Sequence, residues 1–410
     1  MFISAEATQR TFACERVRAL ASGIIETAGT TFLLLIAVRW FQAGATVKAL
    51  IACGGSVGLL LSPLVVFVVE SRRWKTASAA SWVAGIGAAC FLLMAIFQNI
   101  VVFTAGGIVA MAASSAMIPL LTHIYQENYP AHSRGRLFSQ TMMIRIGATI
   151  FFSEFAGRVL TQDLRHFTWL LVVFAAAFAL ASICLGRCPS GRLASTGVSH
   201  PFRGLRFVAS DRVFRQTLIC WMLMGFANLM MLPMRVEYLA NPKYNLSLTV
   251  SQIALLTGVI PNCARLLLTP VWGWLFDHAN FFALRMALNV GFALGILAFF
   301  TSTDLWGLFL GAVIHGIANA GGDVAWSLWV TRFAPEGRVA DYMSVHTFFT
   351  GIRGVLAPIV GFHAIASLSF GALGIMNALL IVGATMILLP ELKHGHRGKP
   401  ANALIDEVKA

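Results

Sequence analysis

The sequence predicts an all-α membrane protein whose twelve transmembrane helices form two pseudo-symmetric six-helix bundles. Three observations lead to this fold class. Of the 410 residues, 58% are hydrophobic and only 11% are charged, whereas soluble domains average about 25% charged residues. Apolar runs of transmembrane length recur along the whole chain, and the two halves repeat a short motif at corresponding positions.

Apolar runs long enough to cross a bilayer as a helix occur twelve times. Because the residues before the first run lack a basic region followed by a cleavage site, we expect that run to be retained as a span. An even number of spans puts both termini on one side of the membrane. The predicted spans are approximately 17–40, 46–69, 77–98, 100–123, 137–160, 167–186, 216–238, 250–276, 283–301, 304–330, 342–365 and 368–390.

The distribution of basic residues orients these spans. The formal net charge of +13 would favour nucleic-acid binding in a soluble domain. If both termini are cytoplasmic, however, most of the 30 Lys and Arg residues lie in inner segments, as the positive-inside rule requires. We therefore predict a multi-pass protein of the inner (plasma) membrane that does not bind nucleic acid. The residues assigned to the outer side are Arg39, Lys48, Arg158, Arg165, Arg235 and Lys243.

The chain is predicted to divide into an N-terminal six-helix bundle (1–186), a cytoplasmic linker (187–215), a C-terminal six-helix bundle (216–390) and a cytoplasmic tail (391–410). The linker mixes arginine with phenylalanine. It is either a solvated connection or an interfacial segment that contacts anionic lipid.

A repeated motif relates the two halves. Residues 59–70 (LLLSPLVVFVVE) and 266–277 (LLLTPVWGWLFD) share three leucines, a Ser or Thr, a proline and a final acid. A second pair, NYPAHSRGRLFSQ from residue 128 and FAPEGRVADYMS from residue 333, follows the fourth span of each half. Such internal repeats are typical of secondary transporters. Spans 3, 6, 9 and 12 have uncharged apolar cores and are expected to face lipid.

The segment GWLFDHANFFALR (273–285) is similar to the G-x-x-x-D-R-x-G-R-R loop of the major facilitator superfamily, and the whole chain resembles that superfamily. The first-half copy is degenerate, with Val66 in place of the glycine. The resemblance implies a secondary transporter that works by alternating access and is not an enzyme. It also implies gating roles at the inner face, although these charges could serve topology alone. The gating candidates are Glu70, Arg72, Arg73, Gly273, Asp277 and Arg285.

Span 10 carries a polar and aromatic stripe. On a helix with 100° per residue, six of its residues fall within about 120° of arc. Polar groups at this depth are costly in lipid and are therefore candidates for function. The stripe consists of His315, Asn319, Gly322, Asp323, Trp326 and Trp329. Similar faces carry Glu26 in span 1, Arg145 in span 5, Asn228 in span 7, Arg265 in span 8, and His346 with Arg353 in span 11.

The interior charges suggest an anionic solute. Arg145, Arg265 and Arg353 outnumber Glu26 and Asp323 by one, and a guanidinium offers a planar fork to carboxylate or phosphate. The alternative is that acids and helix carbonyls neutralise all three arginines. Glu154 is not counted, because Arg158 lies four residues later and is expected to pair with it locally.

Glu26 and Asp323 are the predicted proton-coupling residues, because burial can bring a carboxyl group into a useful titration range. Two alternatives remain open. Glu26 could instead form a fixed ion pair with Arg265 or Arg353, and Asp323 could belong to a gating salt bridge.

The sequence thus predicts proton-coupled symport of a small organic anion. Its partners are a small-molecule substrate, protons and membrane lipid, with no cofactor or metal. The alternative is a proton-coupled exporter of lipophilic or cationic compounds, although the Gly-Pro antiporter signature is absent from span 5. No ATP-binding loop occurs, and the seven cysteines lack metal-ligand spacing. The substrate-binding candidates are Arg145, Asn228, Arg265, His315, Asn319, Trp326, His346 and Arg353.

Overall fold

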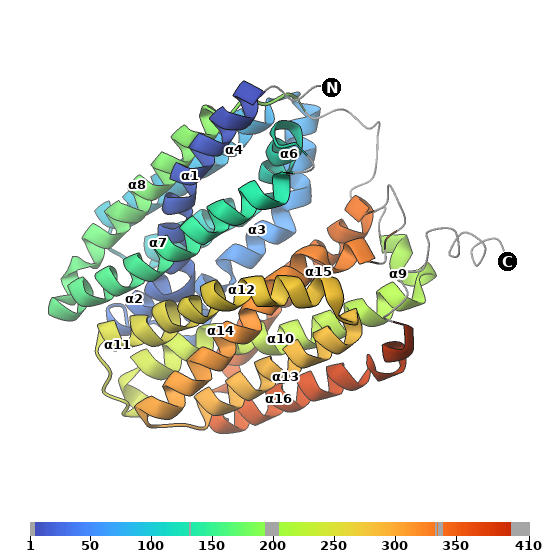
Figure 1. Ribbon diagram of the computed structural model, residues 1–410. Helices are drawn as coiled ribbons and strands as arrows, with labels where there is room; N and C mark the ends of the chain where they lie inside the picture. Colours follow the sequence, from blue (N-terminus) through green and yellow to red (C-terminus); the bar gives the residue numbers. More distant parts are fainter. Residues whose placement is uncertain (1–4, 131–132, 193–204, 333, 335–338, 395–410) are drawn as a thin grey trace.

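The computed structural model describes residues 5–130, 133–192, 205–332, 334 and 339–394. These residues are almost entirely helical, and the helices run roughly side by side in two groups (Figure 1). Residues 335–338, which carry the predicted PEGR loop, and most of the predicted C-terminal tail lie outside the described residues.

The first half begins with a single helical run from Ala5 to Arg39. A π-helical segment, η1 (Ala28–Phe32), interrupts this run between α1 (Ala5–Thr27) and α2 (Leu33–Arg39). The remaining helices of this half are α3 (Ala45–Ser71), α4 (Thr76–Ile96), α5 (Ile100–Ala116), α6 (Ile118–Asn128), α7 (Arg134–Gln162), the short η2 (Leu164–His166) and α8 (Phe167–Gly186).

The second half has a corresponding interruption in its second span. A second π-helical segment, η5 (Leu255–Val259), lies between α11 (Val250–Ala254) and α12 (Ile260–His278). The other elements are α9 (Arg206–Ser210), α10 (Arg212–Ala240), η4 (Pro242–Tyr244), α13 (Phe281–Phe300), α14 (Leu305–Leu328), η6 (Trp329–Arg332), α15 (Val339–Ala364), α16 (Phe370–Met386) and η7 (Leu389–His394).

Ten helical segments of the described chain are long and apolar enough to cross a membrane. The helices α7 and α16 account for the two remaining predicted spans: α7 is long but carries internal charges, and α16 is apolar but has only 17 residues. The predicted fold class is therefore confirmed. The first helix differs from its prediction, because it starts at Ala5 instead of near residue 17. In the part of the helix that precedes the predicted span, the buried Glu15 pairs with Arg18 at 2.7 Å.

Side chains that accept backbone N–H groups start several of these helices, as N-cap residues do. Thr249 and Gln252 form a reciprocal capping box at the start of α11. Other N-cap acceptors are Asn99 of α5, Asp211 of α10, Asn280 of α13, Asp304 of α14 and Ser369 of α16.

Small residues let the helices approach closely, as is common between membrane helices. A Cβ at Gly58 of α3 would meet the backbone of Ala112 of α5, and one at Gly316 of α14 would meet Pro261 of α12. On the outer surface, α4, α8, α13 and α16 expose large apolar side chains such as Trp82, Trp169 and Leu379. These faces suit contact with lipid, but Phe151 of α7 and Trp306 of α14 are equally exposed, so exposure does not single out every third span.

Several hydrogen bonds join the two halves at one end of the molecule. Arg39 at the end of α2 donates to the carbonyls of Ala240 and Leu248 at 3.0 and 2.6 Å. Ser251 of α11 donates its backbone N–H to Thr161 of α7 at 2.8 Å. This is the end at which α2 and α7 approach α11 in Figure 1, and it corresponds to the predicted outer side.

Candidate functional site

The centre of the molecule holds four charged side chains from four helices, here called the central charge network: Glu26 (α1), Arg145 (α7), Arg265 (α12) and Asp323 (α14). Arg145 Nε donates to Glu26 Oε2 at 2.6 Å. Arg265 donates from Nη1 to Glu26 Oε1 at 2.9 Å and from Nε to Asp323 Oδ2 at 2.5 Å. The network therefore connects the first half of the chain with the second.

The central charge network is balanced and only partly enclosed. Its two guanidiniums face two carboxylates, and Asn262 accepts a further hydrogen bond from Arg265 at 3.2 Å. The Arg265 side chain is 8% exposed and that of Glu26 is 14% exposed, whereas Arg145 and Asp323 are 36% and 42% exposed. Charged groups that are accessible within membrane-spanning helices require water instead of hydrocarbon. An incoming polar solute could therefore reach both ends of the network.

These contacts bear on the alternatives that the sequence left open. Glu26 does pair with Arg265, and it also pairs with Arg145, which was not anticipated. Arg353 takes no part in the network. The expected local pair between Glu154 and Arg158 is present at 2.6 Å.

The polar stripe of α14 is divided among different neighbours. His315 is buried and packs against Phe292 of α13, with ring centroids 5.8 Å apart. Asp323 faces α12. Trp326 lies near His346 of α15, with centroids 5.5 Å apart. Residues spread over about 120° of a helix surface can contact several neighbouring helices. Lying on the same side of α14 therefore did not bring these residues into one cavity. Asn319 of α14 and Asn228 of α10 are both partly buried.

A second group of polar residues lies inside the second half, here called the basic–aromatic cluster: Trp221, Arg285, Trp326, Trp329, His346 and Arg353. The Arg285 guanidinium lies over the Trp221 ring, 3.5 Å from its centroid. His346 contacts the rings of Trp221 and Trp329 at 5.4 and 5.2 Å. Arg353 donates to the Trp221 carbonyl. These contacts bring together α10, α13, α14, η6 and α15.

The predicted gating residues fall into two places. Glu70 lies in the last turn of α3, and Arg72 and Arg73 are exposed just after that helix. Gly273 and Asp277 lie in the last turns of α12. Arg285 is separate from them and fully buried. The motif comparison assigned Arg285 to the inner loop, but α13 already begins at Phe281. Arg285 is therefore one turn into the helix, on its buried face.

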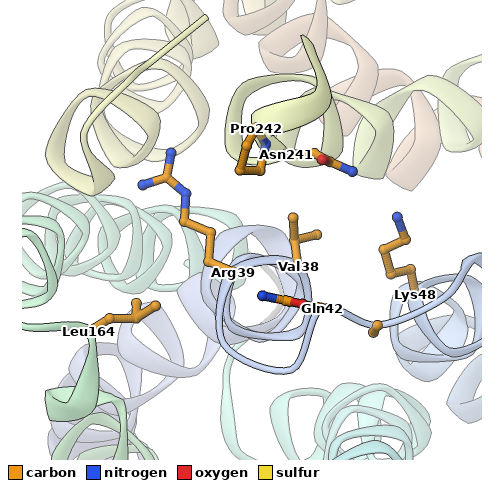
Figure 2. A pocket seen from close by; sticks show the side chains of 8 residues that line it. Val38, Arg39, Gln42, Lys48, Leu164, Asn241 and Pro242 are labelled. Carbon is orange, nitrogen blue, oxygen red and sulfur yellow. The ribbon is translucent and has the colours of Figure 1, made fainter. Parts of the chain in front are cut away.

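A cavity of about 500 Å³ lies at the joined end of the two halves. Figure 2 shows Arg39, Gln42 and Lys48 from the first half facing Asn241 and Pro242 from the second. Lys48 is buried and forms a salt bridge with Glu237 at 2.6 Å. Lys48 and Arg235, which the sequence assigns to the outer side, are buried within helices α3 and α10. Glu237, the partner of Lys48, was missed because it lies at the very end of a predicted span.

Two joined helical halves with a charged interior form a fold that this chain shares with solved transporter structures. The sequence profile of the Major Facilitator Superfamily matches residues 238–406, which lie in the second half. A search of curated proteins found no match.

Solved structures of this fold cover nearly the whole chain. The nucleoside transporter NupG has 14% identity and a TM-score of 0.72, over 92% of this chain and 99% of that one. A POT family transporter in complex with a thioalcohol-conjugated peptide has 12% identity and a TM-score of 0.74, over 94% and 96%. The human organic anion transporter MFSD10 has 15% identity and a TM-score of 0.67, over 93% and 99%. At these identities the likeness establishes the shared fold.

Proposed function

We propose that the protein carries a small organic anion across the inner membrane together with protons, by alternating access. Proteins with this fold are described as transporters of nucleosides and of organic anions, so the fold alone does not choose the solute. The observation that carries the proposal is the central charge network, in which Arg265 contacts two carboxylates from two different helices.

The network suggests how anion and proton binding are coupled. A carboxylate or phosphate entering the site would compete with Glu26 and Asp323 for the fork of Arg265, since guanidinium forms strong charge-assisted pairs with both. A carboxylate that loses its cation in a partly enclosed site takes up a proton more readily. Binding of the anion therefore promotes binding of a proton, and both cross the membrane together.

The contacts between the halves support the alternating-access part of the proposal. With cytoplasmic termini, the bonds of Arg39 and the Lys48–Glu237 pair lie on the outer side and keep it closed. Opening to the outside requires these bonds to break. The inner ends of α3 and α12, with Glu70 and Asp277, would then approach each other and close the inner side.

A ligand screen tests the choice of solute. The detergent-purified protein is heated with lactate, benzoate or citrate, with glucose, or with tetraphenylphosphonium, at one chloride concentration and one ionic strength. A ligand that binds only the folded state raises its stability by mass action. We expect at least one of the organic anions to raise the unfolding temperature of the wild type and of Arg158→Gln, but not of Arg265→Gln.

Arg158 is the matched control because its guanidinium also pairs with a carboxylate, but on the exposed surface of α7. Stabilisation by tetraphenylphosphonium, with no response to any anion, would contradict the proposal. It would favour the exporter of lipophilic cations, with Glu26 and Asp323 as its acids.

A further inference from the structure

The basic–aromatic cluster contains two buried positive charges for which the described residues offer no carboxylate. Arg285 is fully buried beside the neutral thiol of Cys220, and none of its three guanidinium nitrogens has a hydrogen-bond partner of good geometry among the described side chains and backbone. Arg353 is 7% exposed, and its only bond in the described chain goes to the neutral carbonyl of Trp221. Both arginines and His346 contact the same residue, Trp221.

The contacts that are present offset little of the cost of burying these charges. A cation over an aromatic ring gains less free energy than the removal of an ion from water costs, even after the protein relaxes. The Trp221 ring beneath Arg285 is therefore an insufficient partner. Asn289, one turn further along α13, adds no negative charge, and its amide donates to Thr385 of α16 at 2.9 Å.

The unused polar atoms of the cluster are nearly all donors. They include all three guanidinium nitrogens of Arg285, Nε of Arg353 and the indole N–H of Trp221. Both ring nitrogens of the fully buried His346 are also unpartnered within the described residues, and at least one of them carries a hydrogen. A set of buried donors with excess positive charge is complementary to an acceptor with negative charge.

Packing limits the size of such a ligand. The rings around His346 have centroids 5.2–5.5 Å from it, so the cluster is already dense. Gly225 of α10 makes room for the guanidinium of Arg353, because a Cβ there would overlap it. Such close packing leaves room for an anion of one or a few atoms at most, and it excludes an organic solute with a carbon skeleton.

We propose that the interior of the second half binds a small inorganic monoanion of the halide class between Arg285, Arg353, His346 and Trp221. This site is separate from the central charge network, whose arginines are already paired with Glu26 and Asp323. The anion holds α10, α13 and α15 together by neutralising the charges that these helices bury. The inference does not rest on the proposed function, and it holds whichever solute the protein carries.

The test uses the full-length protein purified in gluconate buffer. Chloride or bromide replaces gluconate at constant ionic strength, and the unfolding temperature is recorded. We expect a saturable rise of several degrees in the wild type and in Arg158→Gln, and no rise in Arg285→Gln. In pure gluconate, Arg285→Gln should be at least as stable as the wild type, because it buries one uncompensated charge fewer.

Two further measurements distinguish a halide site from an organic-anion site and from no anion site. If benzoate stabilises the wild type through Arg285 while chloride has no effect, the cluster belongs to an organic-anion site and the halide proposal is wrong. A second readout needs no variant: iodide should quench part of the tryptophan fluorescence of the wild type saturably, and chloride should compete. Quenching that rises only linearly with iodide, together with no chloride-dependent stability, would overturn the proposal.

Discussion

At the scale of single residues, the interior arginines differ in whether a carboxylate pairs with them. Arg145 and Arg265 are paired with acids, so their charge becomes available only when a carboxylate is displaced. Arg285 and Arg353 are not paired with described acids and attract an anion permanently. The expected excess of one interior arginine was counted without Arg285. The count was incomplete because the sequence motif placed this residue in a loop.

Gly225 offers a residue-scale prediction. In Gly225→Ala the new Cβ would displace the Arg353 guanidinium from the Trp221 carbonyl, and overpacking of this kind costs about 1–3 kcal/mol. We expect a lower unfolding temperature and a weakened chloride response in thermal unfolding. Gly383→Ala on α16 is the control, because a Cβ there meets no atom within 4 Å. Equal effects of both substitutions would show that the space at Gly225 is not specific.

Single residues also show why the site could be predicted only in part. Glu26, Arg145, Arg265 and Asp323 were recognised because each is a charge in an apolar span, which is rare in lipid. Their pairing could not be derived in full, since it depends on how the two halves pack. For the same reason His315 was grouped with Asp323, although His315 packs against α13 and Asp323 pairs with Arg265 of α12.

At the scale of elements, hydrophobic length predicted the spans well, because the bilayer fixes how many apolar residues a helix needs. Hydrophobic length did not predict the π-helical segments η1 and η5. They interrupt the first span and the eighth span and touch through Thr31 and Thr257, whose hydroxyl oxygens are 3.0 Å apart. π-Helical turns are often found at functional sites, and these two face each other across the junction of the halves.

The contact between α3 and α10 gives an element-scale prediction. The side chains of Lys48 and Glu237 are both buried. Removing one partner of a buried ion pair costs about 3–5 kcal/mol of folding stability. We expect Lys48→Met to lower the free energy of unfolding by this amount, and Lys48→Met with Glu237→Leu to recover much of it. Chemical denaturation of the purified variants measures both.

The exposed Glu154–Arg158 pair provides the comparison, because its partners are 31% and 72% exposed and surface pairs contribute about 0–1 kcal/mol. Arg158→Met should therefore change stability little. If Lys48→Met were as mild as Arg158→Met, the outer closure would not depend on this buried pair.

At the scale of the whole molecule, two halves meet through polar contacts at one end and through the central charge network in the middle. This arrangement links the occupancy of Arg265 to the contact between the halves, since Arg265 belongs to the second half and Glu26 to the first. A solute that separates this pair weakens one of the bonds that hold the halves together. In the proposed mechanism, coupling and conformational change therefore act through the same residues.

The most direct test of this account is proton uptake into proteoliposomes that contain a pH-sensitive dye, with the stabilising anion from the ligand screen supplied outside. The wild type and Glu154→Gln should acidify the interior when the anion is added. Glu26→Gln should not acidify it, yet should still exchange labelled for unlabelled anion. Acidification by Glu26→Gln at the wild-type rate would contradict the account, because protons would then cross without the carboxylate that links the two halves.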